Sequence, residues 1–222
     1  MTRLKKTLLI GAAVLLLIAV IGGWMFYRST GRALLRAEGF VFRRMQVTRL
    51  ESGDYRFFYA TNRQPGDPDG ALGRRFTNQR SPELRFGSYD VAIEPSLGLS
   101  SIFDPSKWFR DEEIALREAR STSRTGWIEE LRETVEGSPH NSLLIIVHGY
   151  REQFPSALRK TAFVSHVLDL NTPVLLFDWP GDHGGGPLAA YRRAIEVATA
   201  SGQELAQTLQ LVMREIRPGR LW

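Results

Sequence analysis

Two short, uninterrupted apolar runs in the second half of the chain constrain its fold most strongly. LLIIVH spans Leu143–His148, and PVLLFDW spans Pro173–Trp179. Neither run alternates between apolar and polar residues, which is typical of strands covered on both faces in a parallel sheet. Between them, Phe154–Leu168 has apolar residues at helical spacing, and the sequence NTP at 171–173 predicts a turn. We therefore expect a right-handed strand–helix–strand crossover.

The apolar stripe expected for the middle helix is long. It comprises Phe154, Ala157, Leu158, Ala162, Phe163, Val167 and Leu168. Such a stripe is the pattern of a helix packed on a sheet.

Two strands are expected ahead of this unit. Tyr55–Thr61 and Phe86–Ile93 are rich in aromatic and β-branched residues, and an antiparallel pair is the simplest arrangement for them. Thr125–Val135 has apolar residues at helical spacing and predicts a helix. The charged stretch Arg110–Arg120 gives at most a weak helical pattern.

The last third of the chain predicts two helices and the beginning of a strand. Pro187 is a good first helical residue after three glycines. The sequence SGQE at 201–204 resembles a capping box, which would begin a second helix. Pro218-Gly219 would end it, and Arg220–Trp222 would then be the first residues of one more parallel strand.

The N-terminal segment Thr7–Tyr27 carries no charge and is about as long as the roughly 20 residues that cross a bilayer. It predicts a membrane anchor. A cleaved signal peptide is the alternative, but Trp24 and Tyr27 suit a membrane interface better than a cleavage site. We expect residues 1–27 to form a tail and anchor, 28–53 a basic linker, and 54–222 the folded domain.

The charge of the chain is concentrated near this anchor. Nine Lys or Arg against two Glu in residues 1–53 give +7, which leaves −2 of the formal +5 for residues 54–222. A nucleic-acid partner is therefore not expected, and membrane lipid is the expected partner of the basic linker. Cysteine is absent, which excludes disulfides and thiolate metal sites. No metal and no cofactor is expected.

Four motifs in order resemble a bacterial alpha/beta hydrolase family of unknown specific function. They are YATNR at Tyr59–Arg63, FG at Phe86-Gly87, IIVHGY at Ile145–Tyr150 and FDWPGD at Phe177–Asp182. The resemblance covers about Tyr55–Trp222. It implies an α/β fold, with a mostly parallel sheet and flanking helices, preceded here by one transmembrane helix. It also implies a serine hydrolase that acts on an ester or similar acyl substrate.

The resemblance assigns a role to the loop after LLIIVH. In alpha/beta hydrolases, this loop supplies a backbone N–H to the oxyanion hole. On that reading Gly149 gives close access to the substrate, and Tyr150 or Arg151 carries the donor. His148 becomes a residue that supports the loop from behind. The alternative is an ordinary strand end with a buried, hydrogen-bonded histidine.

The family's catalytic triad is missing from the sequence. The sequence contains no G-x-S-x-G elbow, and Arg220–Trp222 lies where the elbow strand would begin. We therefore expect the fold to be incomplete at the C-terminus, with the chain forming the N-terminal part of a hydrolase. A rival polar site could form from Asp178, Asp182 and His183, which flank a strand end.

Two functions remain open at this point. The first is a membrane-anchored esterase-like hydrolase, which takes a small ester substrate once completed. The second is a non-catalytic, membrane-tethered remnant or interaction module. The apolar strands also predict self-association through an exposed sheet edge. The expected location is a bacterial inner membrane, crossed once, with the domain in the periplasm.

Overall fold

The computed structural model describes residues 15–25, 28, 45–93, 114–182 and 184–222. One compact unit comprises Arg43–Glu94 and Asp111–Trp222, and a second comprises Met1–Phe42 and Pro95–Arg110. The first unit is the folded domain.

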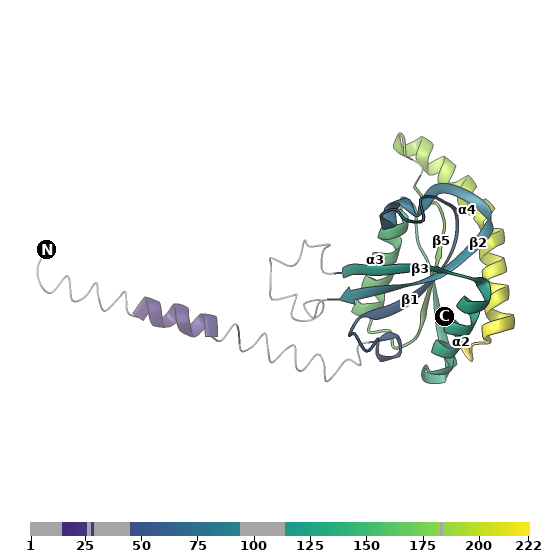
Figure 1. Cartoon of the computed structure of the whole chain (residues 1–222). Helices are drawn as coiled ribbons and strands as arrows, with labels where there is room; N and C mark the ends of the chain where they lie inside the picture. Colours follow the sequence, from purple (N-terminus) through teal and green to yellow (C-terminus); the bar gives the residue numbers. More distant parts are fainter. Residues whose placement is uncertain (1–14, 26–27, 29–44, 94–113, 183) are drawn as a thin grey trace, which may run out of the picture. The chain divides into compact units, whose positions relative to one another are not determined.

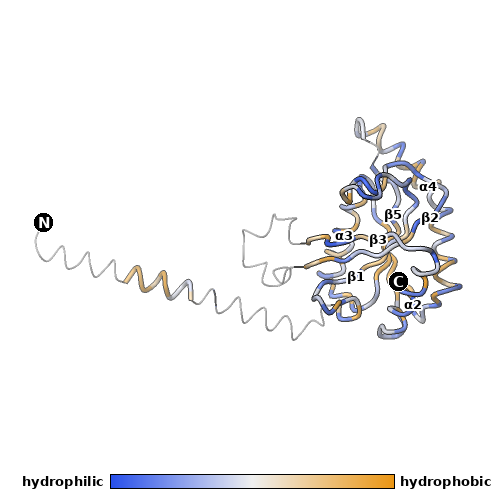
Figure 2. The backbone as a smooth tube through the Cα atoms, viewed as in Figure 1, coloured by the Kyte–Doolittle hydropathy of each residue, from blue (hydrophilic) through white to orange (hydrophobic). Residues whose placement is uncertain are grey.

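In the second unit the structure describes residue 28 and a helix over residues 15–25, which is largely hydrophobic (Figure 2). Residues 15–25 belong to the segment expected to span a membrane, and its other residues, 7–14 and 26–27, lie outside the described residues. Among the helices that the structure describes, none is both long and apolar enough to cross a bilayer.

The described part of the domain contains a six-stranded sheet with the order β3-β2-β1-β5-β4-β6 (Figure 1). Three of its five strand pairs, β1–β5, β4–β5 and β4–β6, are parallel. The expected antiparallel opening pair is confirmed as β1–β2, and β2–β3 is also antiparallel. The strands are β1 Tyr55–Pro65, β2 Phe76–Ile93, β3 Ile114–Thr122, β4 Ser142–Val147, β5 Val174–Asp178 and β6 Arg220–Leu221.

Helices cover both faces of the sheet. Figure 1 shows α3 on one side, and α2 and α4 on the other. The helices are α2 Arg124–Glu136, α3 Phe154–Val167 and α4 Pro187–Leu211, and α4 ends in a π-helical turn at Val212–Ile216. Short 3₁₀ turns lie at Gln46–Thr48, Leu72–Arg74 and Pro139–Asn141. The expected crossover is therefore confirmed as β4-α3-β5.

The core has two parts because β1 alternates its side chains between the two faces of the sheet. Phe58 and Ala60 belong to the cluster under α2 and α4, where Trp127 packs on Phe86 with ring centroids 4.7 Å apart. Phe57 and Tyr59 have their aromatic contacts elsewhere: Tyr59 meets Phe154 of α3 edge to face at 5.2 Å, and Phe57 stacks on Tyr89.

The weak helix expected at Arg110–Arg120 is wrong where the structure describes it. Ile114–Thr122 is strand β3, whose residues pair with β2 from Phe86 to Ile93. Its burial pattern, with Ile114 and Ala119 buried among exposed residues, is that of an edge strand with one face on the core. Pairing with β2 decides the structure of this stretch, which local propensity leaves open.

The expected break in the last helix is also wrong, because α4 runs through Ser201 without interruption. Ser201 and Glu204, which were expected to form the capping box, bind side chains of the sheet instead. Asn62 Nδ2 donates to Ser201 Oγ over 2.9 Å and to Glu204 Oε2 over 3.1 Å. Glu204 also forms an ion pair with Arg80, at 2.5 Å. These buried contacts fasten the middle of α4 to β1 and β2.

Candidate active-site loop

Three neighbouring strands bring polar residues to one edge of the sheet. Strand β5 lies between β1 and β4, and all three run in the same direction. Their carboxyl ends therefore meet at one edge, the usual place for ligand sites in open α/β sheets. Thr61 and Arg63 lie near the end of β1, Asp178 ends β5, and His148 follows β4.

Asp178 joins the three strand ends. Its Oδ2 accepts from Thr61 Oγ1 at 2.6 Å and from Arg63 Nε at 2.7 Å, and its Oδ1 lies 3.0 Å from His148 Nε2. Burial of this carboxyl raises its pKa, but the Arg63 charge and the hydrogen bond from His148 outweigh burial and hold the pKa below its ordinary value. Asp178 is thus a buried, ionised centre.

The other N–H groups of Arg63 bind the loops that follow β4 and β5, and one side chain of β2. Its Nη2 donates to the carbonyls of Glu152 and Trp179, both at 2.9 Å, and its Nη1 donates to Asn78 Oδ1 at 2.6 Å. The Arg63 side chain is completely buried. One guanidinium therefore ties together the two loops that would line a substrate site.

His148 is held on both ring nitrogens. Its Nδ1 lies 2.9 Å from the carbonyl oxygen of Gly149, and its Nε2 lies 3.0 Å from Asp178 Oδ1 and 3.1 Å from the Trp179 backbone nitrogen. The Trp179 indole donates to the His148 carbonyl at 2.9 Å and stacks on the imidazole. Neither nitrogen is left to activate a nucleophile. The geometry gives His148 a positioning role.

The loop from Gly149 to Glu152 carries two amides that remain unused. The Arg151 N–H, at a residue with positive φ, donates to the Gly181 carbonyl at 3.0 Å, so it is not open to a substrate. Within the described residues, the amides of Gly149 and Tyr150 have no acceptor. A Cβ built at Gly149 would meet nothing within 4 Å, so the loop is open on that side of Gly149.

Glu152 fixes the far end of this loop to α3. Its carboxylate accepts from Ser156 Oγ at 2.6 Å and forms an ion pair with Lys160. Burial raises the pKa of Glu152, but the hydrogen bonds from Lys160 and Ser156 lower it by more. The pKa of Glu152 therefore lies below its ordinary value. The loop is therefore tied at both ends, by His148 and by Glu152.

Of the rival polar site, the structure describes Asp178 and Asp182. Asp178 is committed to the buried network. Asp182 accepts from Gln153 Nε2 at 3.2 Å and from the Gly184 N–H at 3.3 Å, and His183 lies outside the described residues. Among the residues described, no group of three His, Cys, Asp or Glu could hold a metal ion. Gly184 and Gly185 have positive φ, a backbone conformation that favours glycine, so the conformation of the loop accounts for these two glycines.

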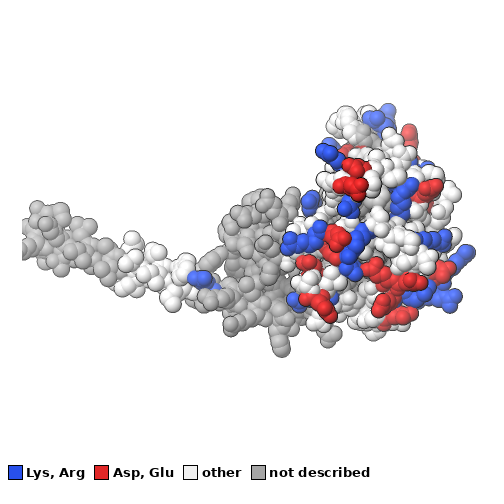
Figure 3. Space-filling view, in the orientation of Figure 1, with Lys and Arg blue, Asp and Glu red and all other residues white. Residues whose placement is uncertain are grey.

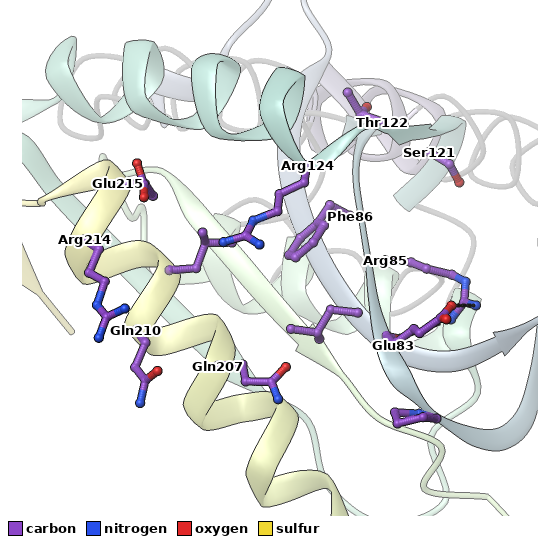
Figure 4. Close-up of a pocket in the computed structure, with 13 residues that line it drawn as sticks. Glu83, Arg85, Phe86, Ser121, Thr122, Arg124, Gln207, Gln210, Arg214 and Glu215 are labelled. Carbon is purple, nitrogen blue, oxygen red and sulfur yellow. Dashed lines mark hydrogen bonds and ion pairs between the residues drawn. The ribbon is translucent and has the colours of Figure 1, made fainter.

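A hollow of about 720 Å³ lies away from this network, between the strands β2 and β3, the start of α2 and the second half of α4. Figure 4 shows Arg124 reaching from α2 toward α4, and Gln207 reaching from α4 toward β2. Its lining mixes arginine, glutamine and apolar residues, and it includes none of the site residues predicted from the sequence. The hollow is thus separate from the loop that follows β4.

Sequence reasoning missed Thr61, Arg63 and Glu152 as members of the site. The signal for Arg63 was present in YATNR, because an arginine that closes an apolar strand needs a buried acidic partner. The partner, Asp178, was identified only as part of a rival site. Without the order of the strands, the ends of β1 and β5 could not be placed side by side.

The comparisons with known proteins agree with this fold. Residues 123–220 match the model of a family described as alpha/beta hydrolase of unknown function (DUF900). The resemblance to an alpha/beta hydrolase family is confirmed. The matched segment contains β4, the loop after it, α3, β5 and α4, and hence most of the candidate site. No curated protein and no solved structure matches the chain.

Proposed function

We propose that the domain is an esterase-like alpha/beta hydrolase in which the amides of Gly149 and Tyr150 stabilise the oxyanion of an acyl substrate. The observation that carries this proposal is the pair of unused N–H groups beside open space, on a loop whose two ends are anchored. Donors held in place before the reaction stabilise developing negative charge without reorganisation.

The buried network gives the loop its rigidity. Arg63 holds the Glu152 carbonyl, Asp178 holds His148, and the Arg151 amide is bonded to the Gly181 carbonyl. An exposed loop without such anchors would pay an entropic cost each time that it gathered around a substrate. The ion pair between Arg63 and Asp178 therefore serves the site by positioning the loop.

The proposal gives this chain the oxyanion-stabilising part of the reaction and no nucleophile. Within the described residues no serine contacts a ring nitrogen of His148, and the sequence holds no G-x-S-x-G elbow. The purified chain should therefore not turn over p-nitrophenyl esters by itself.

An added nucleophile tests the oxyanion donors directly. With p-nitrophenyl butyrate and hydroxylamine, attack on the carbonyl forms the hydroxamate and releases p-nitrophenol. The chain should accelerate this reaction above its rate in buffer. Tyr150→Pro removes one N–H and should abolish most of the acceleration, whereas Tyr150→Phe keeps the N–H and should retain it. Equal rates for both variants would overturn the proposal.

We also propose that the domain is tethered to a membrane through residues 7–27, with the domain in the periplasm. The support is in the sequence, where 21 consecutive residues carry no charge and basic residues lie on both sides. The full chain should stay in the membrane fraction through an alkaline carbonate wash. Release of the chain, or a mature N-terminus near Tyr27 by intact mass, would refute the anchor.

A further inference from the structure

The outward face of α3 is apolar over its second half. Phe163, Val164, Val167 and Leu168 are 46%, 41%, 53% and 62% exposed. Three of them were expected in the buried stripe, and that expectation is wrong. Ala157, Leu158 and Ala162 do lie in the core, together with the polar side chains of Thr161, Ser165 and His166. The buried face of α3 is therefore turned relative to the predicted stripe, and large apolar side chains lie on the solvent side.

These four residues form one continuous surface, which we call the α3 patch. Positions 163 and 164 lie one helical turn before 167 and 168, so their side chains are neighbours on one face. Arg159 and Lys160 precede them on the same exposed face. Lys160 is paired with Glu152, whereas Arg159 has no partner among the described residues. Cations beside an exposed apolar strip are typical of helices that lie in a membrane interface.

The chain enters the domain beside the α3 patch. Met45 N donates to Asp169 Oδ1 at 3.2 Å, and Val47 N donates to Asn171 Oδ1 at 3.1 Å. Asp169 directly follows Leu168, and the Met45 side chain is buried. Residues 45–47 are thus fixed to the turn at which the patch ends.

The sequence before Met45 leads back to the proposed anchor within a short distance. Only residues 28–44 separate the two, and 17 residues reach at most about 60 Å when fully extended. Arg28, Arg32, Arg36, Arg43 and Arg44 lie in this linker. Their charges favour a position close to anionic head groups, at roughly 1 kcal/mol for each residue near the surface.

We propose that the α3 patch is a membrane-docking surface, which inserts Phe163, Val164, Val167 and Leu168 into the head-group region of the bilayer that holds the anchor. Arg159 lies among the anionic head groups. The proposal rests on the proposed anchor. It gives the domain a fixed face toward the lipid, in place of free rotation on a tether. The occupant is a bilayer that contains anionic phospholipid.

Spin labels can test this proposal on the full chain, because the sequence has no cysteine and each introduced cysteine is unique. The chain is reconstituted in vesicles of phosphatidylethanolamine and phosphatidylglycerol. Labels are placed at Phe163→Cys and Val167→Cys, and a control label at Ala198→Cys on the exposed side of α4. Collision with oxygen, which concentrates in lipid, is compared with collision with a water-soluble nickel chelate.

The ratio of oxygen to nickel collisions should be severalfold higher at residues 163 and 167 than at residue 198. A label at Val167 with the same ratio as Ala198 would overturn docking. Low collision with both reagents would also overturn it, because the patch would then be covered by protein, such as residues 29–44 or a second copy. A carbonate wash of the same vesicles checks the anchor separately. Retention together with a water-exposed patch refutes docking alone, whereas release refutes the anchor.

Discussion

Arg63 Nε lies 2.7 Å from Asp178 Oδ2, and neither side chain is exposed to solvent. This pair joins the end of β1 to the end of β5, and through His148 it reaches the loop after β4. Two charges taken out of water are stabilising only when each is fully paired. The ion pair therefore holds the strand ends of the site together. Removing one partner leaves the other charge buried without a counter-ion.

Arg63→Met should destabilise the domain by roughly 3–5 kcal/mol, because it leaves the Asp178 carboxylate buried without its cation. Urea denaturation of the full chain, followed by far-UV circular dichroism, measures this loss. Arg63→Met combined with Asp178→Leu removes both charges and should recover part of it. A double variant as unstable as the sum of the two single variants would show that the pair is not coupled.

Acid should weaken the domain through Asp178. Its pKa is lowered in the folded state, so its contribution to stability is complete above the ordinary value of about 4 and is lost as the pH falls through the folded pKa. The melting temperature of the unchanged chain should therefore fall more steeply between about pH 5 and pH 2 than that of Asp178→Asn. Parallel melting curves over this range would contradict the ionised state of Asp178.

Gly87 should not tolerate a side chain. A Cβ at this position would lie 2.0 Å from the Arg120 carbonyl oxygen and 2.4 Å from Tyr59 Oη. Gly87→Ala should cost roughly 1–3 kcal/mol, because the β2–β3 pairing must shift to make room. Gly202→Ala, where nothing lies within 4 Å, is the matched control and should not destabilise. Thermal melts of the two variants decide the point.

Gly149→Ala separates the function of the loop from its stability. The new Cβ would meet no protein atom within 4 Å, and φ at this position is not positive, so the melting temperature should not change. The methyl group would occupy the space that a substrate carbonyl needs, so the hydroxylamine-dependent cleavage should fall. Gly186→Ala, which also points into open space, should leave that cleavage unchanged. Unchanged cleavage in both variants would remove Gly149 from the site.

The crossover unit could be predicted from sequence because its signals are local. Uninterrupted apolar runs identify β4 and β5, and a 3.6-residue period identifies α3. The same signals failed where long-range contacts decide the structure. Ile114–Thr122 is a strand because β2 pairs with it, and Ser201 stays inside α4 because Asn62 binds it.

The candidate site was only partly predictable for the same reason. His148 and Gly149 stand out at the end of an apolar run, and a positioning role for His148 follows from its two occupied nitrogens. The commitment of the Arg151 amide to Gly181 joins two loops, which no local pattern reports. The motifs YATNR and FDWPGD become one network only when β1 and β5 are placed side by side.

The most direct test of the oxyanion donors is a nitrogen–proton NMR titration of the full chain with a monoanionic alkylphosphonate ester, which resembles the tetrahedral oxyanion. The account predicts that the amides of Gly149 and Tyr150 shift most, and that the Arg151 amide, which is bonded to Gly181, moves little. Shifts spread over unrelated amides, or none at Gly149 and Tyr150, would contradict it.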